Sequence, residues 1–366
     1  MPKMPKSQIK RISQTQIAKE LEISQALVSM ALNGRKKGIS EKAYKTIWEF
    51  ALENGYSPRG MNLDTAKENT SVATAGYILR SPLKLANKSN FFSHIHQGLY
   101  DTLNDNEVKT IFLGSEDDIA KSDKDTPLTL PDSVKGIAIM GEVHPDFLQT
   151  IRKLNRPIVY ISARESGKCH SVLSNESESA ELLVDHLCEL GHTNFAWLGG
   201  NRGMGRQEDR LNGISMALES RNLKLKTPFK INQIDADRKE GFEVAKQLIE
   251  QSKPEDLPTA WICLNGLMAR GAINFLFQNG YKVGSDVSVA AFDMTNVCTE
   301  EDPTITCAGA NPEDMGSEAA RILLSTIKEK SKALSDFILP TSIRVGESTG
   351  PHLAPAMPVP ERPVRS

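Results

Sequence analysis

The feature that most constrains the fold is an alternation of short apolar runs with helix-like segments, from Val72 to about Glu347. The helix-like segments are about ten to fifteen residues long, and their apolar residues recur at helical spacing. Strands that alternate with such helices are typical of βαβ units, which form parallel sheets. Because about 275 residues are generous for one sheet, the pattern predicts an α/β core with two similar lobes.

The expected strands are the most apolar runs, at 73–79, 110–113, 136–140, 158–161, 195–198, 260–264 and 287–292. The expected helices lie at 179–190, 207–221, 240–251, 268–279 and 313–328. In the first of these helices, Leu183, Leu187 and Leu190 share one face with His186, which predicts a packed, hydrogen-bonded histidine there.

The segments that flank this core differ from it in composition. Residues 10–58 have the pattern of short helices, and residues 59–71 are polar and read as a linker. Residues 1–60 have a charge balance of +6, whereas residues 61–366 have a balance of −8. A small basic module on an acidic body favours a polyanionic partner. The core is predicted at 72–348, and the proline-rich residues 349–366 are predicted to be a disordered tail.

Composition argues against several classes of protein. The five cysteines are scattered and never spaced as Cys-x-x-Cys, which favours reduced, buried thiols over a disulfide or zinc framework. The histidines form no metal-binding pattern, and no cofactor is expected. There is no apolar run of about 18 residues and no secretory signal, so we expect a cytoplasmic protein without membrane contact.

Residues 13–34 predict two short helices joined by a tight turn. Ile17, Ala18 and Leu21 place apolar groups on one side of a first helix, and Ser24 is well placed to cap a second. The second helix would be buried by Leu27, Val28, Ala31 and Leu32, which leaves Gln25, Ala26, Ser29 and Met30 on its outer face. A recognition helix meets base edges in the major groove with this N-terminal part.

The side chains on and around the second helix suit DNA. Gln25 can form two hydrogen bonds with adenine, Ser29 can reach a base or a phosphate, and lysines nearby favour counterion release. The expected DNA-contacting residues are Ser13, Thr15, Ser24, Gln25, Ala26, Ser29, Met30, Asn33, Lys36, Lys37 and Arg59. The alternative is a three-helix unit that has polar residues on its exterior and does not bind DNA.

Several segments, taken in order, are similar to one known family. They are Thr15–Asn33, Ile39–Lys42, Gly55–Pro58, Leu190–Gly200, Arg210–Ile214, Pro258–Asn265 and Gly284–Asp293. Together they span some 330 residues and resemble the LacI/GalR family of bacterial transcription regulators. The resemblance implies a helix-turn-helix headpiece followed by a two-lobed core similar to periplasmic sugar-binding proteins. The implied lobes are 72–172 with 308–333, and 173–307 with 334–348.

The resemblance also implies an effector site between the lobes. Arg210, Asn265 and Asp293 lie where the family contacts its effector, and their donors and acceptors suit vicinal hydroxyls. Phe91 or Phe92 could stack on a sugar face or pack in the core, and the sequence favours neither. The expected partners are a near-palindromic DNA operator, a small-molecule effector that is a carbohydrate, and a second copy in a homodimer.

The sequence departs from the family pattern in both parts. Met30 stands where an arginine is usual, and Thr65 stands where a leucine normally enters the minor groove. In the core, Gly266 and Met294 replace two aspartates, which predicts a less polar cleft. The glycine-rich segment 199–205 lacks the order of a phosphate loop and is expected to be a turn that lines the cleft.

Three functions are compatible with these observations. The first is an effector-controlled DNA-binding transcription regulator, acting as a repressor. The second is a cytoplasmic ligand-binding protein with weak or vestigial DNA binding. The third is an enzyme built on the α/β core, which is disfavoured because no nucleophile, base and acid stand together. His192, three residues after Glu189, is expected to form a helix-end cap interaction instead.

Overall fold

The computed structural model of the protein describes residues 13–32, 39–40, 43–44, 46–47, 50–51, 73–80, 90–123, 129–329 and 333–352. The chain divides into two compact units, Met1–Thr70 and Ser71–Ser366, which we describe separately. The expected linker at 59–71 lies outside the described residues, as does the tail from 353 onward. Among the described residues, no helix has the length and hydropathy that a bilayer span requires.

The N-terminal unit contains the expected pair of helices, α1 (Gln14–Glu20) and α2 (Gln25–Leu32). The Ser13 hydroxyl accepts from the Gln16 N–H at 3.2 Å, and the Ser13 N–H donates to the Gln16 side chain at 2.8 Å. This reciprocal pair satisfies backbone donors that a helix start leaves open. The Ser24 hydroxyl accepts from the Leu27 N–H at 3.2 Å, which confirms the expected second cap.

The two helices pack through the apolar residues that the sequence pattern identified. Ile17 and Ala18 of α1 are buried in one cluster with Val28, Ala31 and Leu32 of α2. Later residues of the unit, Ile47 and Ala51 among them, join this cluster. The helix-turn-helix predicted from the sequence is therefore confirmed as the fold of this segment.

The C-terminal unit contains two six-stranded sheets, and we call the first sheet with its helices the N-lobe. Its strand order is β11-β5-β4-β3-β1-β2, and all its strand pairs are parallel. The strands are β1 (Thr74–Leu79), β2 (Lys109–Ser115), β3 (Val134–Met140), β4 (Ile158–Ile161), β5 (His170–Ser174) and β11 (Asp336–Leu339). The helices are α4 (Asn90–Asp105), α5 (Glu116–Asp123), α6 (Pro145–Arg152) and α12 (Pro312–Glu329).

Helices cover both faces of the N-lobe sheet because its strands are apolar on both sides. Ala138 and Met140 of β3 belong to the cluster that contains α4 and α12. Ile137 and Ile139, the alternate residues of the same strand, pack with Ile151 of α6.

We call the second sheet with its helices the C-lobe. Its strand order is β12-β10-β9-β8-β6-β7, and only β12 is antiparallel to its neighbour. The strands are β6 (Phe195–Gly199), β7 (Lys230–Asn232), β8 (Ala260–Cys263), β9 (Ser288–Phe292), β10 (Thr306–Gly309) and β12 (Ser342–Arg344). The helical elements are α7 (Glu176–Glu189), α8 (Gly205–Glu219), η2 (Thr227–Phe229), α9 (Arg238–Gln251), η3 (Pro254–Asp256), α10 (Gly266–Gln278) and α11 (Asn296–Thr299).

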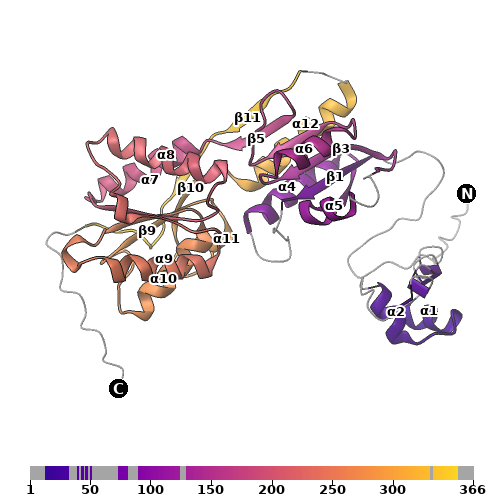
Figure 1. The fold of residues 1–366 in the computed structure, drawn as a ribbon, viewed down its shortest axis with the longest axis horizontal. Coiled ribbons are helices and arrows are strands. Elements are labelled where there is room, and N and C mark those ends of the chain that lie inside the picture. Colours follow the sequence, from indigo (N-terminus) through magenta and orange to yellow (C-terminus); the bar gives the residue numbers. More distant parts are fainter. Residues whose placement is uncertain are drawn as a thin grey trace, which may run out of the picture. The chain divides into compact units, whose positions relative to one another are not determined.

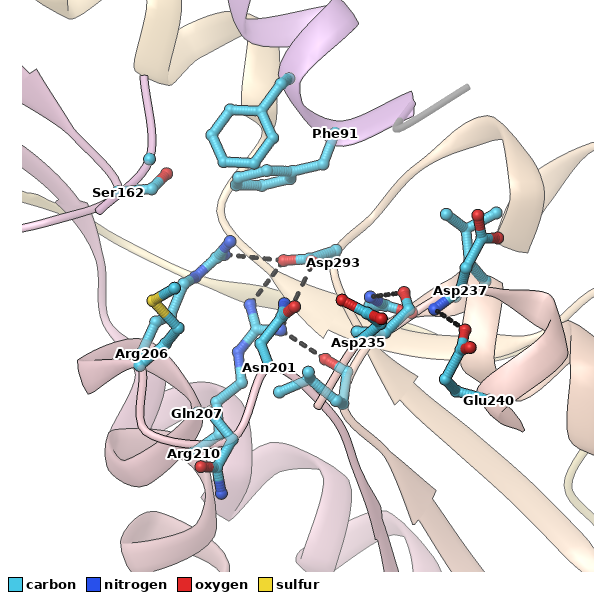
Figure 2. Close-up of a pocket in the computed structure, with 18 of the residues that line it drawn as sticks. Phe91, Ser162, Asn201, Arg206, Gln207, Arg210, Asp235, Asp237, Glu240 and Asp293 are labelled. Carbon is cyan, nitrogen blue, oxygen red and sulfur yellow. Dashed lines mark hydrogen bonds and ion pairs between the residues drawn. The ribbon is translucent and has the colours of Figure 1, made fainter. Parts of the chain in front are cut away.

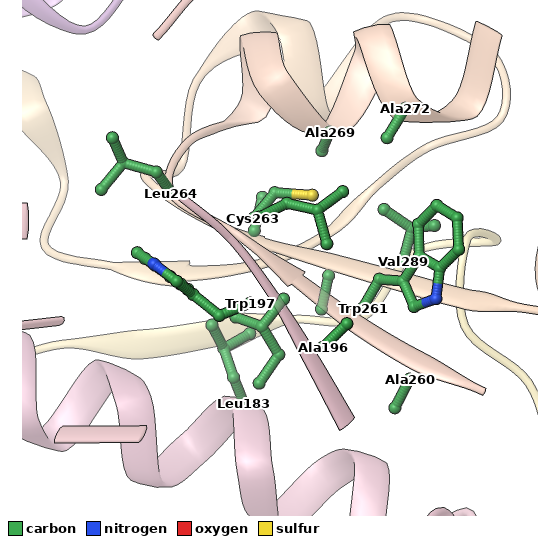
Figure 3. Packing of buried hydrophobic residues seen from close by; sticks show 14 of the residues in the cluster. Leu183, Ala196, Trp197, Ala260, Trp261, Cys263, Leu264, Ala269, Ala272 and Val289 are labelled. Atoms are coloured by element: carbon green, nitrogen blue, oxygen red, sulfur yellow. The ribbon is translucent and has the colours of Figure 1, made fainter. Parts of the chain in front are cut away.

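The C-lobe core lies on both faces of its sheet. Helices α7 and α8 lie on one side, and α9 and α10 on the other (Figure 1). Figure 3 shows Trp197 and Trp261 in the sheet, between Leu183 of α7 and Ala269 of α10. Both indoles are fully buried, and each N–H donates to an oxygen at 2.8 Å, that of Trp197 to the Asn232 side chain and that of Trp261 to a backbone carbonyl. Their polar atoms are therefore satisfied.

All seven expected strands and all five expected helices of the core are present. The sequence missed β5, β7, β10, β11 and β12, which are short or rich in polar residues. In β5, His170, Ser171 and Ser174 are polar yet buried, because the strand lies between β4 and β11. A search for apolar runs cannot find such a strand.

The expected lobe boundaries were wrong at the third crossing between the lobes. Residues 334–348 were assigned to the second lobe, but Asp336–Leu339 pair with β5 in the N-lobe sheet. The chain crosses at Pro340 and Thr341, and β12 then joins the C-lobe. The pairing of β11 with β5 at the edge of the sheet decides this boundary, and local sequence does not show which strands pair. The expected tail also starts later than 349, because the His352 N–H donates to the Leu190 carbonyl at 2.8 Å.

The isolated histidines and cysteines have structural roles. His186 contacts the Thr349 hydroxyl at 2.9 Å, as expected for a packed, hydrogen-bonded residue. The cap interaction expected of His192 with Glu189 is wrong: His192 is buried and contacts the Thr259 and Ser288 hydroxyls and the Gly350 carbonyl. All five cysteines are free, and four of them are buried.

Candidate functional site

A cavity of about 640 Å³ lies between the two lobes. Its N-lobe wall includes Arg80, Gly141 and Ser162, which follow β1, β3 and β4 directly. Its C-lobe wall includes Asn265 and Asp293, which follow β8 and β9 closely. These residues all lie at the carboxyl ends of parallel strands, where open α/β sheets bind their ligands.

The C-lobe wall contains a closed network of buried charges around Arg210. The Arg210 guanidinium, 2% exposed, donates to Glu176 and to Asp293 at 2.6 Å each, and also to the Leu264 carbonyl. Arg206 donates to the same two carboxylates at 2.6 and 2.7 Å. Figure 2 shows both arginines converging on Asp293. Two cations and two anions thus balance one another, as buried charges require.

The pKa values in this network follow from that balance. Burial raises the pKa of Asp293, but Arg206 and Arg210 outweigh it, so the net shift is downward. Burial lowers the pKa of Arg210, but Asp293 and Glu176 outweigh it and raise the pKa overall. Both groups are therefore held in their charged forms. Asp293 also has a φ of 72°, a left-handed conformation that is rare outside glycine and clusters at functional sites.

Phe91 and Phe92 pack in the N-lobe core, which is one of the two roles that the sequence left open. Both are buried in the N-lobe core on α4, and their rings form an edge-to-face pair with centroids 5.2 Å apart. Both also line the cavity. The Arg206 guanidinium lies over the Phe91 ring, 4.2 Å from its centroid, so α8 of the C-lobe contacts α4 of the N-lobe.

Asn265 lines the cavity, but its side chain is largely engaged elsewhere. Its oxygen accepts from the Met268 N–H at 2.8 Å and caps α10, and its nitrogen donates to the Ala236 carbonyl at 3.1 Å. The next residue is Gly266, where a Cβ would lie 2.5 Å from the Cys298 sulfur. Packing against Cys298 therefore explains why no side chain stands at position 266.

The N-lobe wall has a different character. Arg80 is 9% exposed, and among the described residues its guanidinium has no hydrogen bond or ion pair. Burial lowers the pKa of Arg80, and Glu142 opposes this shift only in part. The Ser162 hydroxyl is buried and has no partner among the described residues. Glu142 itself accepts from the Gly205 N–H across the cavity at 2.8 Å.

Charged side chains are frequent on the cavity wall, although aspartates are absent at 266 and 294. Five basic and five acidic side chains line the cavity: Arg80, Arg206, Arg210, Arg238, Lys239, Glu142, Asp235, Asp237, Glu240 and Asp293. These charges come from the N-lobe, from α8, from the start of α9 and from Asp293. The glycine-rich segment 199–205 does line the cavity, through Asn201 and Met204.

One of the missed residues had a readable signal in the sequence. Arg206 precedes Arg210 by four positions, which places both on one face of a helix. Arg80 ends an apolar run, but only the strand order shows that it lies beside Gly141. Glu176 starts α7 and was not separable from other helix-start acids.

The structure describes seven of the eleven expected DNA-contacting residues, and they lie on α1, on α2 and at the starts of these helices. Gln25 and Ala26 are exposed at the start of α2, and Ser29 and Met30 are half-buried one turn later. Ser13, Thr15 and Ser24 are exposed. Asn33, Lys36, Lys37 and Arg59 lie outside the described residues. No cluster of metal-binding side chains occurs within the part of the chain that the structure describes.

Comparison with known proteins agrees with this architecture. Residues 184–349 match a family described as a periplasmic binding protein-like domain. The probable HTH-type transcriptional repressor ExuR of Bacillus subtilis is 27% identical over 335 residues, which cover 91% of this chain and 96% of ExuR. Among solved structures, a transcriptional regulator CelR–cellobiose complex matches with a TM-score of 0.66 and 20% identity, over 92% of this chain and 100% of CelR.

A second solved structure includes DNA. The lac repressor dimer bound to operator matches with a TM-score of 0.63 and 19% identity, over 93% of this chain and 99% of the repressor chain. The relatives are transcriptional repressors and not enzymes. With its helix-turn-helix and its two-lobed core of parallel sheets, this chain is similar over nearly its whole length to transcription regulators of the LacI/GalR family.

Proposed function

We propose that the protein is a repressor whose affinity for a DNA operator is set by a small polyhydroxylated ligand in the cavity between its lobes. The observation that carries this proposal is the cavity itself, whose polar side chains come from the carboxyl ends of strands in both sheets. The cellobiose that CelR binds supports a carbohydrate as the class of ligand. The proposed domains are a headpiece at 10–58, a linker at 59–71 and a core that starts at 72.

The DNA-binding half of the proposal rests on α2. Gln25 and Ala26 are exposed at its N-terminal end, while Val28, Ala31 and Leu32 fix its opposite face in the headpiece core. An anchored helix with a free N-terminal end suits major-groove readout. We propose that two copies of the chain read a near-palindromic operator, since the lac repressor binds its operator as a dimer.

The regulatory half rests on contacts that join the two lobes across the cavity. Gly205 of α8 donates to Glu142 of the N-lobe, and Arg206 lies on the Phe91 ring. A ligand between these elements binds both walls, so it favours one relative position of the lobes over another. Operator affinity then changes by the difference in ligand affinity between the two positions.

Gel-shift titrations with fragments of the protein's own promoter region test the DNA-binding half. We expect binding that weakens steeply with salt, because phosphate contacts release counterions. The Gln25→Ala variant should lose about 1–3 kcal/mol of base discrimination. The Lys37→Ala variant is the matched control, with affinity lowered evenly across sequences. If a genome-wide selection at low salt recovers no palindromic fragment, the repressor proposal fails, and ligand binding without DNA binding would favour the vestigial-headpiece alternative.

A thermal-shift screen of sugars tests the regulatory half. A ligand at a hundred times its dissociation constant should stabilise the core by about 2.7 kcal/mol. The same ligand should change the operator affinity in the gel shift. A metabolite of another class that produces both effects, with no response to any sugar, contradicts the carbohydrate proposal.

A further inference from the structure

Two polar groups on the N-lobe wall of the cavity have no partner within the described part of the chain. The Arg80 guanidinium carries a full charge on a residue that is 9% exposed. The Ser162 hydroxyl, on a residue that is 7% exposed, makes no hydrogen bond. An unpaired buried charge is costly, and a buried hydroxyl without a partner adds to the cost. Both residues line the same cavity.

The fold holds these two groups in place through neighbouring strands. Arg80 follows β1 and Ser162 follows β4, and β3 lies between these strands. At the end of β3, Gly141 has a φ of 84°, and a Cβ there would lie 2.6 Å from the Arg80 Cδ. The stem of Arg80 therefore runs across a position that only glycine leaves open. The side chain of Arg80 is therefore held along the cavity wall by its contact with Gly141.

Ser162 is held in an unfavourable backbone conformation. Its φ is 62°, in the left-handed region, and its N–H donates to the Val172 carbonyl at 2.9 Å. Strained conformations of non-glycine residues cost about 1–3 kcal/mol and cluster at ligand clamps. Within the described structure, the Ser162 hydroxyl makes no hydrogen bond that would offset this strain. Figure 2 shows Ser162 across the cavity from Arg206 and Asp293.

The other charges of the cavity do not neutralise Arg80. Arg206 and Arg210 are balanced by Glu176 and Asp293. Arg238 pairs with Glu301. Glu142, Glu116 and Asp235 oppose the lowered pKa of Arg80, but none of them forms an ion pair with it in the described structure. Of the four arginines that line the cavity, Arg80 is thus the one whose guanidinium has no ion pair with a described residue. A carboxylate fits best, because the planar guanidinium fork matches its two oxygens.

We propose that the ligand is a sugar acid with a single carboxylate, and that Arg80 binds this carboxylate while the Ser162 hydroxyl donates to it. The hydroxyl groups of the ligand then face Asp293, Arg206 and Asn265 on the C-lobe wall. This inference rests on the proposed function, since it names the class of ligand for the same cavity. The carboxylate supplies Arg80 with its missing counter-charge, so a neutral sugar of the same size binds less tightly.

Calorimetric titration of the full-length protein with matched sugars tests the inference. The probes are glucose with glucuronate and gluconate, galactose with galacturonate, and glucose 6-phosphate as the dianionic arm. We expect at least one acid to bind at least about tenfold more tightly than its neutral partner, as hydrogen bonds to charged groups allow. Its affinity should exceed that of glucose 6-phosphate.

Variants separate the carboxylate site from the rest of the cavity. Arg80→Met should weaken acid binding about 10- to 100-fold and leave the affinity for the neutral sugar within about threefold. Arg80→Lys should recover part of the loss, because the charge stays and the fork is lost. Ser162→Ala should weaken acid binding by a smaller factor. The matched control is Arg321→Met, which removes the same charge from the exposed surface of α12 and should change nothing.

The outcomes distinguish this inference from the proposed function. If a neutral sugar or the sugar phosphate binds most tightly, or if Arg80→Met retains full affinity for the acid, the carboxylate site is wrong while ligand control stands. If no sugar, acidic or neutral, changes either the melting temperature or the operator affinity, both proposals are overturned. Circular dichroism melts of each variant confirm that the core is folded.

Discussion

The two walls of the cavity differ in how they treat buried charge. On the C-lobe wall, Arg206 and Arg210 share Glu176 and Asp293 at distances of 2.6–2.7 Å. On the N-lobe wall, the Arg80 guanidinium has no ion pair with any described residue. On the first wall the arginines have their ion pairs without a ligand. On the second wall Arg80 lacks a counter-charge, which a ligand can supply.

This contrast separates two roles for an arginine in a binding site. A paired arginine orients its carboxylate partner and stabilises the fold, so its removal leaves the partner's charge uncompensated. An unpaired buried arginine weakens the ligand-free fold and gains its counter-charge only on binding. Removing an arginine should therefore lower the stability of the ligand-free protein on the C-lobe wall and should not lower it on the N-lobe wall.

The largest expected effect is the loss of Arg210. Arg210→Met leaves Glu176 and Asp293 with only Arg206, and breaking a buried pair in this way costs about 3–5 kcal/mol. Urea denaturation of the ligand-free protein measures it. The control is Arg238→Met, which removes a pair with Glu301 that is about 40% exposed on both sides and should cost less than about 1 kcal/mol. If the two variants lose the same free energy of unfolding, the buried network around Arg210 is no more important for stability than an exposed ion pair.

A smaller effect is expected when a side chain is added to the C-lobe wall. Gly266→Asp places a Cβ against the Cys298 sulfur, and overpacking of this kind costs about 1–3 kcal/mol. The double variant with Cys298→Ala should recover part of the loss, because the two sites share one contact. Thermal melts of the single and double variants measure the coupling, and simple additivity would contradict it.

The N-lobe wall should show the opposite sign. In the absence of ligand, Arg80→Met removes an uncompensated buried charge, so stability should stay equal or rise by about 1 kcal/mol. Urea denaturation beside the Arg210→Met variant makes the comparison direct. A loss as large as that of Arg210→Met would mean that Arg80 is structurally paired and that the two walls are alike.

A further expected effect is a pH dependence that separates burial from missing partners. Burial lowers the pKa of His192 to about 4, much as burial lowers that of Arg80, yet the neutral ring contacts the Thr259 hydroxyl, the Ser288 hydroxyl and the Gly350 carbonyl. Because the folded pKa lies below that of a free histidine, its contribution is complete above about pH 6.5 and is lost as pH falls toward 4.

Melting temperatures between pH 7 and pH 4 measure this contribution. The wild type should lose more stability over this range than the His192→Gln variant, by about 2–4 °C for each 1 kcal/mol in a domain of this size. If the melting temperatures of the two proteins fall in parallel with pH, protonation of His192 does not contribute to the loss of stability.

Much of the fold and part of the site can be predicted from the sequence. Apolar runs identified seven strands, and the period of 3.6 identified five core helices and the two headpiece helices, because these elements bury apolar residues. The family resemblance predicted Arg210, Asn265 and Asp293 as effector-contacting residues, and all three line the cavity. The polar strand β5 and the edge strand β11 could not be found in this way, since pairing and not hydrophobicity makes them strands.

The sequence by itself determined the helix-turn-helix, the α/β alternation and the family resemblance, because these depend on local spacing and on the order of motifs. Only the tertiary structure decided how charge is distributed in the cavity. Arg80, Gly141 and Ser162 are up to 82 positions apart, and they meet because β1, β3 and β4 are neighbours in one parallel sheet. Whether a buried arginine has a counter-charge depends on what the fold brings within about 4 Å, and local sequence does not record that.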